Sequence, residues 1–337
     1  MLLTGRPPDP ALIERFRADL AQVWPDDPDL AGVSLGIAVS GGPDSLALLL
    51  LANAAMPGRV RAATVDHGLR PESADEAAFV ARVCEGLGIP HATLRVEVAP
   101  GNLQANARAA RYEALGCHFE QVSASVFATA HHADDQAETL LMRLNRGSGL
   151  AGLAGVRPWS VFFPEGIIAE MVLVRPLLGW RREELAAVVL AAGIEAVDDP
   201  SNSDDAFDRA RMRKAIAEAD WLDPLAMARS ARHLAEAEKA VEDYVSSVAN
   251  RLIWRDGACY FCMGYPRLVE IGVVERILER LGGTEVRRSE IARMVDRLRT
   301  RENASLGGVL AKREWVKTGP NTTSDSVKFE KEPPRRA

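Results

Sequence analysis

The amino-acid sequence predicts an α/β fold, in which a doubly wound parallel sheet is followed by a smaller mixed, largely helical C-terminal domain. Strand-like and helix-like segments alternate through the first part of the chain, which is typical of a parallel sheet with helices on both faces. Polar clusters at residues 40–45, 66–70 and 131–138 each follow an expected strand. Because ligands bind at the carboxyl ends of the strands in such sheets, we expect these clusters to form one site.

Apolar runs bounded by polar residues define the expected elements. Leu35–Val39 has the length and residue types of a buried strand, and the Leu- and Ala-rich run after Ser45 favours a helix. A further helix is expected to begin at Ser73, with Glu76 completing a capping box. The other expected strands are residues 60–65, 91–96, 125–130 and 171–174, and the other helices of this part are residues 103–120 and 133–145.

The alternation of strands and helices ends near residue 220, where one long helix is expected over residues 224–252. We therefore expect a first domain of residues 1–218 and a C-terminal domain of residues 219–319. Residues 320–337 lack apolar periodicity, which predicts a disordered tail.

Composition restricts the class of protein and its compartment. The 337 residues are 47% apolar and 26% charged, as in soluble globular proteins, and no uncharged apolar run reaches the ~18 residues of a membrane span. The N-terminus lacks the basic start and apolar core of a secretory signal. Four cysteines are too few for a disulfide framework in a chain of this length, so we expect a cytoplasmic protein with no membrane partner.

The distribution of charge differs from the net charge of −6, which by itself argues against a nucleic-acid partner. Arg287–Lys317 contains nine basic and four acidic residues, and Arg209–Lys214 reads RARMRK. A solvated helix face is the more common explanation of any single charge run. Two basic stretches in an acidic chain nevertheless favour a polyanionic partner.

The first polar cluster, SGGPDS at residues 40–45, lies between an expected strand and an expected helix. Its glycines allow a ligand to approach the backbone closely, and its serines and backbone N–H groups can bind phosphate oxygens. Asp44 would repel phosphate unless Mg²⁺ lies between them, so we expect a phosphate group together with Mg²⁺ here. The sequence has no G-x-x-x-x-G-K-[ST] motif, and GSGLAG at residues 147–152 follows a helix rather than a strand, so no dinucleotide loop is expected there.

The third polar cluster, HHADDQAET at residues 131–139, combines histidines with carboxylates. On a helix, Asp135 and Glu138 are three residues apart and share a face. Two carboxylates beside a phosphate site suit a cationic amine, which a carboxylate can orient and deprotonate. The alternative is a metal site built from two histidines and two aspartates, but the H-E-x-x-H spacing is absent. Packing of one histidine at the strand end is the simpler explanation.

The SGGPDS loop resembles the pyrophosphate loop (PP-loop) of the N-type ATP pyrophosphatases, a superfamily that cleaves ATP to AMP and pyrophosphate. The HHADDQAET cluster resembles the H-H-x-D-D-Q-x-E-T signature of the tRNA(Ile)-lysidine synthetase family within it. Further stretches resemble this family in the same order: VDHGLR at 65–70, ARAARY at 107–112, NRGSGLAGL at 145–153, RPL at 175–177, DPSN at 199–202 and ASLGGV at 304–309.

The resemblance implies an adenine nucleotide α-hydrolase-like catalytic domain in residues 1–218 and a tRNA-recognition domain in residues 219–319. It implies ATP-dependent ligation of free lysine to carbon 2 of the wobble cytidine of a tRNA(Ile) with a CAU anticodon. The reaction would pass through an adenylated cytidine and give lysidine. The implied cofactors are ATP and Mg²⁺, with lysine as co-substrate, and a homodimer is compatible with the sequence.

The resemblance also implies roles for individual residues. The expected catalytic residues are Asp44, Asp135, Glu138 and Arg111, with Asp44 also on Mg²⁺. The expected ATP-binding residues are Ser40, Gly41, Gly42, Pro43, Asp44, Ser45, Asp66, His67, Arg70 and His131. The expected tRNA or phosphate contacts are Arg108, Arg209, Arg211 and Arg213. Ala210 and Met212 depart from the R-N-R-I-R pattern of the family, whereas the three arginines around them match it.

Two other functions remain as alternatives. A different PP-loop enzyme acting on tRNA, such as a thiolase, would need cysteines near the ATP site. The lone C-x-x-C at Cys259–Cys262 lies well beyond the catalytic domain, so we interpret these thiols as partly buried. A non-catalytic nucleotide-binding module would not need the carboxylates of Asp44, Asp135 and Glu138.

Overall fold

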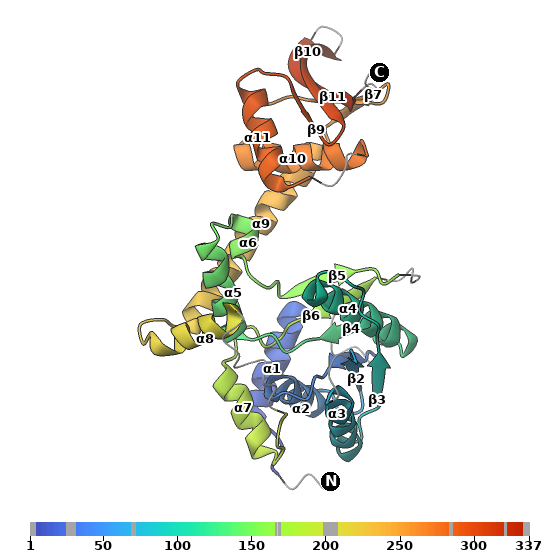
Figure 1. Ribbon diagram of the computed structural model, residues 1–337, viewed down its shortest axis with the longest axis vertical. Helices are drawn as coiled ribbons and strands as arrows, with labels where there is room; N and C mark the ends of the chain where they lie inside the picture. The colour runs from blue at the N-terminus through green and yellow to red at the C-terminus, as the bar shows by residue number, and fades with distance from the viewer. Residues whose placement is uncertain are drawn as a thin grey trace. The chain divides into compact units, whose positions relative to one another are not determined.

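The computed structural model describes residues 5–24, 32–68, 72–165, 167, 170–197, 208–282, 286–319 and 322–332. The chain forms two compact units that divide between Ala235 and Glu236. The N-terminal unit contains a largely parallel sheet with helices α1 to α8, and the C-terminal unit contains a separate antiparallel sheet with α10 and α11 (Figure 1). The predicted fold class, an α/β domain followed by a smaller mixed domain, is confirmed, but the smaller domain is less helical than expected because five strands pair into a sheet there.

The N-terminal unit is built on a six-stranded sheet with the order β3-β2-β1-β4-β6-β5. β5 is antiparallel to β6 at the edge, and the other neighbouring strands are parallel. The sequence analysis did not identify β5, in which exposed Trp159 and Val161 alternate with half-buried residues, as befits an edge strand. The strands are β1 Leu35–Ala38, β2 Val60–Asp66, β3 His91–Arg95, β4 Val126–Ala128, β5 Trp159–Phe162 and β6 Met171–Val174.

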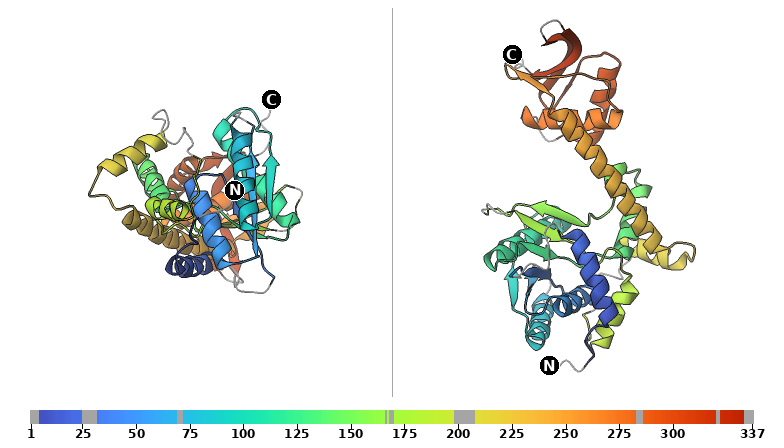
Figure 2. Two further views of the ribbon diagram at one scale, coloured as in Figure 1. Left: turned by 90° about the horizontal axis from the view of Figure 1, so that it is seen from below. Right: turned by 180° about the vertical axis from the view of Figure 1, so that it is seen from behind.

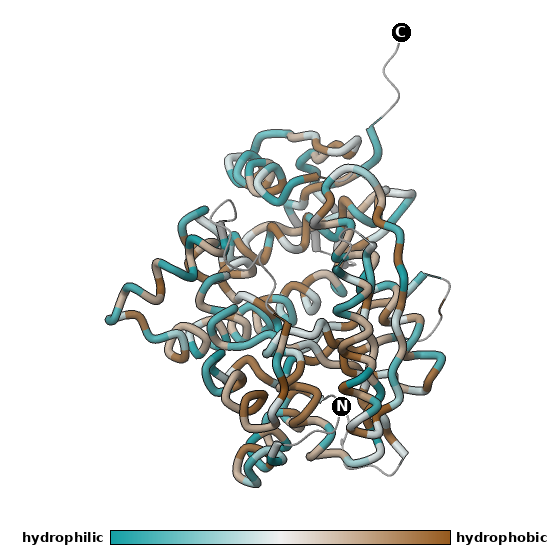
Figure 3. The backbone as a smooth tube through the Cα atoms, turned by 60° about the horizontal axis from the view of Figure 1, so that its bottom comes forward, coloured by the Kyte–Doolittle hydropathy of each residue, from teal (hydrophilic) through white to brown (hydrophobic). Residues whose placement is uncertain are grey.

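Helices cover both faces of this sheet (Figures 1 and 2). α1, α2, α3 and α7 contribute to the larger hydrophobic core, which includes Leu46 and Trp180. α4 belongs to a second core, where Leu115 and Phe119 pack with Phe127 of β4. Apolar segments, brown in Figure 3, gather in the interior of this unit. The helices are α1 Pro10–Val23, α2 Pro43–Ala55, α3 Ser73–Leu87, α4 Leu103–Gln121, α5 Ala133–Asn145, α6 Leu150–Leu153, α7 Arg182–Ala191 and α8 Asp208–Glu218.

The order of the strands reverses at β1, which lies between β2 and β4. Ile37 pairs with Ala62 of β2 on one side and with Ala128 of β4 on the other, so the three strands end at the same edge. The polar clusters that begin at Ser40, Asp66 and His131 follow these strand ends. This is the topological switch point at which open α/β sheets bind ligands. The sequence correctly placed the clusters at one edge.

The start of α3 differs from the prediction. Ser73 is the first residue of the helix rather than its N-cap, and its hydroxyl donates a hydrogen bond of 2.7 Å to Oδ1 of Asp66. The capping box expected between Ser73 and Glu76 is therefore wrong. Asp66 ends the preceding strand, so the serine hydroxyl finds its acceptor through the fold rather than in its own first turn.

The longest helix, α9, comprises Pro224–Ala249 and contains the point at which the two units divide. This helix matches the long helix expected over residues 224–252, whereas the domain boundary was expected earlier, between residues 218 and 219. The first turns of α9 belong to the N-terminal unit because Ala231 is fully buried there, close to Gly155. Within the described parts of the chain, no helix combines the length and the apolar character needed to cross a membrane.

The C-terminal unit contains an antiparallel sheet with the order β7-β8-β11-β10-β9. Its core includes Ile277 of α10, Val295 of α11 and Phe329 of β11, all fully buried. The elements are β7 Ile253–Arg255, β8 Ala258–Phe261, α10 Arg267–Arg280, α11 Arg288–Arg299, β9 Ala304–Leu306, β10 Val309–Gly319 and β11 Thr322–Lys331.

The disordered tail predicted from residue 320 onward is wrong for Thr322–Lys331, which forms β11. This strand pairs with β10 on one side and with β8 on the other. Val327 and Phe329 alternate with polar residues and are fully buried. Two apolar residues in a polar segment are too weak a periodic signal by themselves, and the flanking strands supply the hydrogen bonds that make the segment a strand.

Candidate active site

The loop after β1, residues 40–45, closes on the hydroxyl of Ser45. This buried hydroxyl accepts a hydrogen bond of 3.1 Å from the backbone N–H of Ser40 and donates one of 3.0 Å to the carbonyl of Gly42. The Ser40 hydroxyl, on an exposed residue, lies 3.2 Å from the same oxygen. The loop is therefore held by its own side chains before any ligand binds.

Gly41 and Pro43 give this loop its direction. Gly41 has a φ of +88°, and a Cβ at this position would lie 3.3 Å from Val80, so the turn requires glycine. Pro43 is the first residue of α2, as suits a residue without an N–H, and Gly42 is the N-cap. The electropositive N-terminus of α2 thus lies at the loop, which is the arrangement of a phosphate site.

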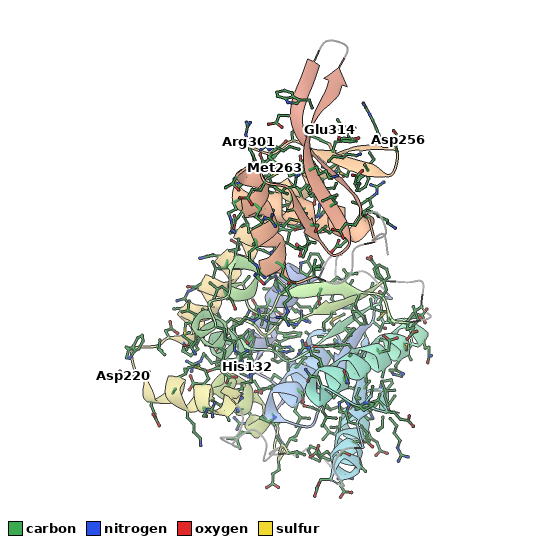
Figure 4. The ribbon with its side chains drawn as sticks, turned by 45° about the horizontal axis from the view of Figure 1, so that its top comes forward. His132, Asp220, Asp256, Met263, Arg301 and Glu314 are labelled. Carbon is green, nitrogen blue, oxygen red and sulfur yellow. The ribbon has the colours of Figure 1, made fainter. Side chains whose placement is uncertain are left out.

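Asp44 lies in the first turn of α2, where its two carboxylate oxygens have different surroundings. Oδ2 lies 3.3 Å from Nε2 of His132, an imidazole whose side chain is 1% exposed. Figure 4 labels His132 within the N-terminal unit. Oδ1 is buried and has no hydrogen-bond partner among the residues that the structure describes. A buried carboxylate oxygen without a donor is suited to a hard divalent cation such as Mg²⁺.

His132 lies among three aspartates. Besides Asp44, its Nδ1 lies 3.5 Å from Oδ2 of Asp134 and its Nε2 lies 3.5 Å from Oδ2 of Asp135. Burial would lower the pKa of His132, but the three carboxylates outweigh it and raise the pKa to about 9. The imidazole is therefore charged at neutral pH, and this charge joins the loop before α2 to the first turn of α5.

Asp135 and Glu138 share a face of α5, as the sequence predicted, but they do not face solvent freely. Arg209 of α8 donates from Nη2 to Oδ1 of Asp135 and from Nε to Oε2 of Glu138, both at 2.7 Å. Arg213 donates from Nε to Oε1 of Glu138 at 2.8 Å. Because Glu138 is 1% exposed and both of its oxygens accept from arginines, it anchors α8 to α5.

The structure thus joins two groups of residues that the sequence analysis had assigned separately. The carboxylates expected to bind an amine are paired with two of the arginines expected to contact phosphate or tRNA. Arg211, the third arginine, is exposed. Ala210 is buried and Met212 is partly buried, so these departures from the family pattern lie on the packed side of α8 and leave the arginine contacts intact.

Asp66 is the last residue of β2, and His67 directly follows it. Oδ1 of Asp66 accepts hydrogen bonds from the Ser73 hydroxyl and, at 2.9 Å, from the backbone N–H of Gly68. These two bonds lower the pKa of Asp66, in that order of importance. Asp66 therefore shapes the turn after β2 rather than offering a free carboxylate. Arg70, the third residue expected here, lies outside the described residues.

Arg111 and Arg108 lie three residues apart on α4 and have different contacts. Arg111 donates a hydrogen bond of 3.3 Å from Nε to Nε2 of His67, and its Nη2 also lies 3.3 Å from this nitrogen. The guanidinium of Arg108 stacks 5.0 Å from the ring centre of Tyr112. Neither contact was foreseen, because each depends on how α4 is placed over the sheet.

His131 follows β4, and its imidazole is neutral at neutral pH. Its Nδ1 lies 3.0 Å from the hydroxyl of Thr129. Burial lowers the pKa of His131 to about 4, and the charges of Arg175 and Arg108 act in the same direction against the attraction of Asp135. The two adjacent histidines therefore have opposite roles: one is a buried cation and the other a neutral hydrogen-bonding group.

Two residues were missed by sequence reasoning as individual site residues. Asp134 accepts a hydrogen bond of 2.8 Å from the backbone N–H of Arg182 and forms an ion pair with the side chain of Arg181. These two contacts hold α5 against the start of α7. Arg175 is 6% exposed and donates a hydrogen bond of 2.8 Å to the carbonyl of Arg157. The signal for Arg175 was a charged residue directly after the apolar strand β6, where a buried charge calls for a structural or binding reason.

Comparison with known proteins identifies the family of this chain. Residues 14–220 match the PP-loop domain family. The chain is 46% identical over 303 residues to the tRNA(Ile)-lysidine synthase of Novosphingobium aromaticivorans, covering 88% of this chain and 89% of that protein. It is 41% identical over 281 residues to the tRNA(Ile)-lysidine synthase of Zymomonas mobilis, covering 82% and 84%. This chain belongs to the tRNA(Ile)-lysidine synthase family. The PP-loop domain implies ATP binding.

A solved structure supports the fold of this family member. The U34-tRNA thiolase NcsA from Methanococcus maripaludis, with its [4Fe-4S] cluster, superposes with a TM-score of 0.53 at 17% identity, covering 67% of this chain and 79% of that chain. At this identity the likeness concerns the fold alone.

The NRGSGLAGL stretch of the lysidine synthase family forms the end of α5 and the short helix α6. Gln136 exchanges two hydrogen bonds with the backbone of Val156, at 2.7 and 2.8 Å, and Arg143 donates 2.6 Å to the carbonyl of Gly152. Gly155 has a positive φ, and a Cβ there would clash with Gln136. Gly147, within the stretch, also has a positive φ and lies between the end of α5 and the start of α6, so it serves a tight turn between two helices rather than a loop between a strand and a helix.

The cysteines of this lysidine synthase family member differ in their burial. Cys84 and Cys259 are fully buried, and burial raises the pKa of each thiol to about 12. Cys262 is exposed and follows the end of β8, so the expectation that both thiols of the C-x-x-C are partly buried is wrong: Cys259 packs in the core of the C-terminal unit, whereas Cys262 lies at the surface. Within the described segments, no group of three or more His, Cys, Asp or Glu side chains is arranged to hold a metal.

The basic segment Arg287–Lys317 is partly neutralised by ion pairs within the C-terminal unit. Arg299 donates a hydrogen bond of 2.6 Å to the buried carboxylate of Glu270, and Arg297 forms an ion pair with Glu302 at 3.2 Å. The field of this segment is consequently weaker than the count of basic residues suggests.

Proposed function

We propose that this protein is a ligase that joins free lysine to carbon 2 of the wobble cytidine of a tRNA(Ile) with a CAU anticodon, at the expense of ATP. Membership of the tRNA(Ile)-lysidine synthase family supports this proposal. The structural observation that carries it is the position of His132 between Asp44 and Asp135. One imidazole separates the phosphate loop from the acidic face of α5, so an activated nucleotide and an amine would meet there.

In the first step, O2 of the cytidine attacks the α-phosphorus of ATP. A new O–P bond forms, the bond to pyrophosphate breaks, and the base carries AMP on its oxygen. This activation is needed because the urea-like carbonyl is a weak electrophile and its oxygen a poor leaving group. The backbone N–H groups of Ser40–Ser45 and the N-terminus of α2 would stabilise the negative charge of the pyrophosphate.

Magnesium fits this step through Asp44, whose buried Oδ1 has no donor among the described residues. Asp44 would hold the ion, while His132 keeps the other carboxylate oxygen in place. When bound, Mg²⁺ supplies positive charge that neutralises the phosphates.

In the second step, the ε-amine of lysine attacks carbon 2. The C–N bond forms, the C–O bond to AMP breaks, and AMP leaves. The amine has an ordinary pKa near 10.4, so it arrives as an ammonium and must lose a proton before it attacks. Burial would raise the pKa of Asp135, but the charges of His132 and Arg209 lower it. Asp135 is therefore a strong counter-ion and a weak base, so we assign it the orientation of the amine, and the proton that the ammonium loses passes to solvent water.

Recognition of the tRNA is assigned to arginines outside this pocket. Arg211 is exposed on α8, next to the arginines that bind α5, and its planar fork suits a phosphate. We also propose that the Arg287–Lys317 segment of the C-terminal unit contacts the tRNA backbone. Such contacts predict affinity that falls with added salt. The substrate places the reaction in the cytoplasm.

The proposal is tested by incubating the protein with ATP, labelled lysine and total bacterial tRNA. Label should enter tRNA only when ATP is present, and Asp135→Asn should abolish incorporation with an unchanged far-UV spectrum. Asp243→Asn, at an exposed ion pair with Lys239 on α9, is the matched control and should retain full incorporation. A protein that hydrolyses ATP without transferring lysine would contradict the proposal.

A further inference from the structure

The contact between Arg111 and His67 constrains which nitrogen of the imidazole carries its proton. Nε and Nη2 of Arg111 each lie 3.3 Å from Nε2 of His67. A guanidinium has N–H donors and no acceptor, so Nε2 must present its lone pair to the arginine. Burial lowers the pKa of His67, and the charge of Arg111 lowers it further, which keeps the ring neutral. The single ring proton therefore resides on Nδ1.

Nδ1 of His67 is buried and forms no hydrogen bond with any residue that the structure describes. Buried N–H groups are almost always paired in folded proteins, and an unpaired one calls for a ligand or another specific reason. His67 directly follows β2, at the edge of the sheet where the loop of Ser40–Ser45 follows β1. The unpaired donor thus lies at the ligand-binding edge of the sheet.

The surroundings of this donor favour an anionic acceptor. The neighbouring carboxylate of Asp66 already accepts from Ser73 and Gly68 through Oδ1. Arg111 brings a positive charge against the ring, and Arg108 lies one turn away on the same helix. A neutral N–H donor beside a cation suits a phosphate oxygen, the acceptor common to ATP and to the tRNA backbone.

We propose that His67 donates a hydrogen bond from Nδ1 to a phosphate oxygen of a bound substrate, and that Arg111 is a positioning residue that fixes the required tautomer. Arg111 then acts through His67 rather than on the substrate. The source of the phosphate rests on the proposed function, whereas the tautomer is a property of the free protein and can be measured without any reaction.

The tautomer is tested by NMR of the full chain labelled with ¹⁵N-histidine, since the nitrogen shifts report which ring nitrogen is protonated. The chain has six histidines, and loss of one signal set in His67→Asn identifies the resonance. The wild type should show Nδ1–H. Arg111→Gln should shift the ring toward the Nε2–H form, and Arg108→Gln, one turn away, should not. A wild-type ring protonated on Nε2 would overturn the proposal.

The donor is tested with two amide variants. Asparagine places its N–H near the position of Nδ1, whereas glutamine places it near Nε2, where it faces the donors of Arg111. Binding of ATP alone and of tRNA alone is measured for both. His67→Gln should weaken one of them about tenfold or more, and His67→Asn should restore most of the affinity. If ATP binding is weakened, the phosphate belongs to the nucleotide. If tRNA binding is weakened, the phosphate belongs to the tRNA backbone. Unchanged binding of both refutes the donor role.

A double-mutant cycle separates positioning from direct contact. Arg111→Gln should lower the affinity in the wild-type background and have little further effect in His67→Asn, because an amide needs no tautomer to be selected. An equal loss in both backgrounds would mean that Arg111 binds substrate itself. Failure of lysine transfer by the wild type would contradict the proposed function, but the tautomer and binding measurements could still be interpreted.

Discussion

Replacing Glu138 by glutamine tests whether this carboxylate anchors α8. Glu138 is 1% exposed and accepts from both Arg209 and Arg213 at 2.7 and 2.8 Å. Glutamine keeps one acceptor oxygen but turns an NH₂ group toward the other arginine. Removing one partner of a buried ion pair typically costs about 3–5 kcal/mol. The arginine side chains are 46% and 26% exposed, so water offsets part of this loss, and we expect about 2–3 kcal/mol.

The assay is thermal unfolding of the full chain combined with amide hydrogen exchange. A loss of this size should lower the Tm of the N-terminal unit by about 4–12 °C, given about 2–4 °C per kcal/mol for domains of this size. Exchange should accelerate in α8, Asp208–Glu218, before it changes in the central strands. Asp296→Asn, at an exposed ion pair of the C-terminal unit, is the control and should leave both readings unchanged. An unaltered Tm with unaltered exchange in α8 would refute the anchoring role.

Three further outcomes are expected. Asp44→Asn should lower the rate of lysine transfer about 100-fold or more and weaken its dependence on Mg²⁺, and a variant with normal magnesium dependence would contradict the assignment. Gly41→Ala should cost about 1–2 kcal/mol of stability and weaken ATP binding, because its φ is +88° and a Cβ would press on Val80; calorimetry checks both. Folded-state His131 has a pKa of about 4, below its ordinary 6.5, so its contribution to stability is complete above pH 6.5 and is lost as pH falls toward 4. Urea unfolding between pH 4 and 7 should therefore show a flatter profile for His131→Asn than for the wild type.

Several features of the site could be read from local sequence because their physical basis is local. The loop at residues 40–45 requires glycine where φ is positive and a residue without an N–H where α2 begins. The sequence shows both residues directly, as Gly41 and Pro43. The alternation of apolar and helical runs located the parallel strands, since buried strands need continuous apolar residues. The common edge of the three polar clusters then followed from the chemistry of parallel sheets.

Features that depend on partners distant in the chain were missed or misassigned. Ser73 looked like a helix cap, but its hydroxyl bonds to Asp66 of the preceding strand. The segment Thr322–Lys331 looked disordered, since only β8 and β10 on either side make it a strand. The domain boundary moved into α9 because packing, rather than composition, decides where that helix belongs.

The sequence by itself determined the α/β class, the phosphate loop and the set of charged side chains that gather beyond three strand ends. Only the tertiary structure decided how those charges are paired. It placed His132 among three aspartates, joined Glu138 to arginines more than seventy residues away, and set Arg111 against His67. The physical reason is that propensity and periodicity act between near neighbours, whereas the state of a buried charge depends on every group that the fold brings within a few ångströms.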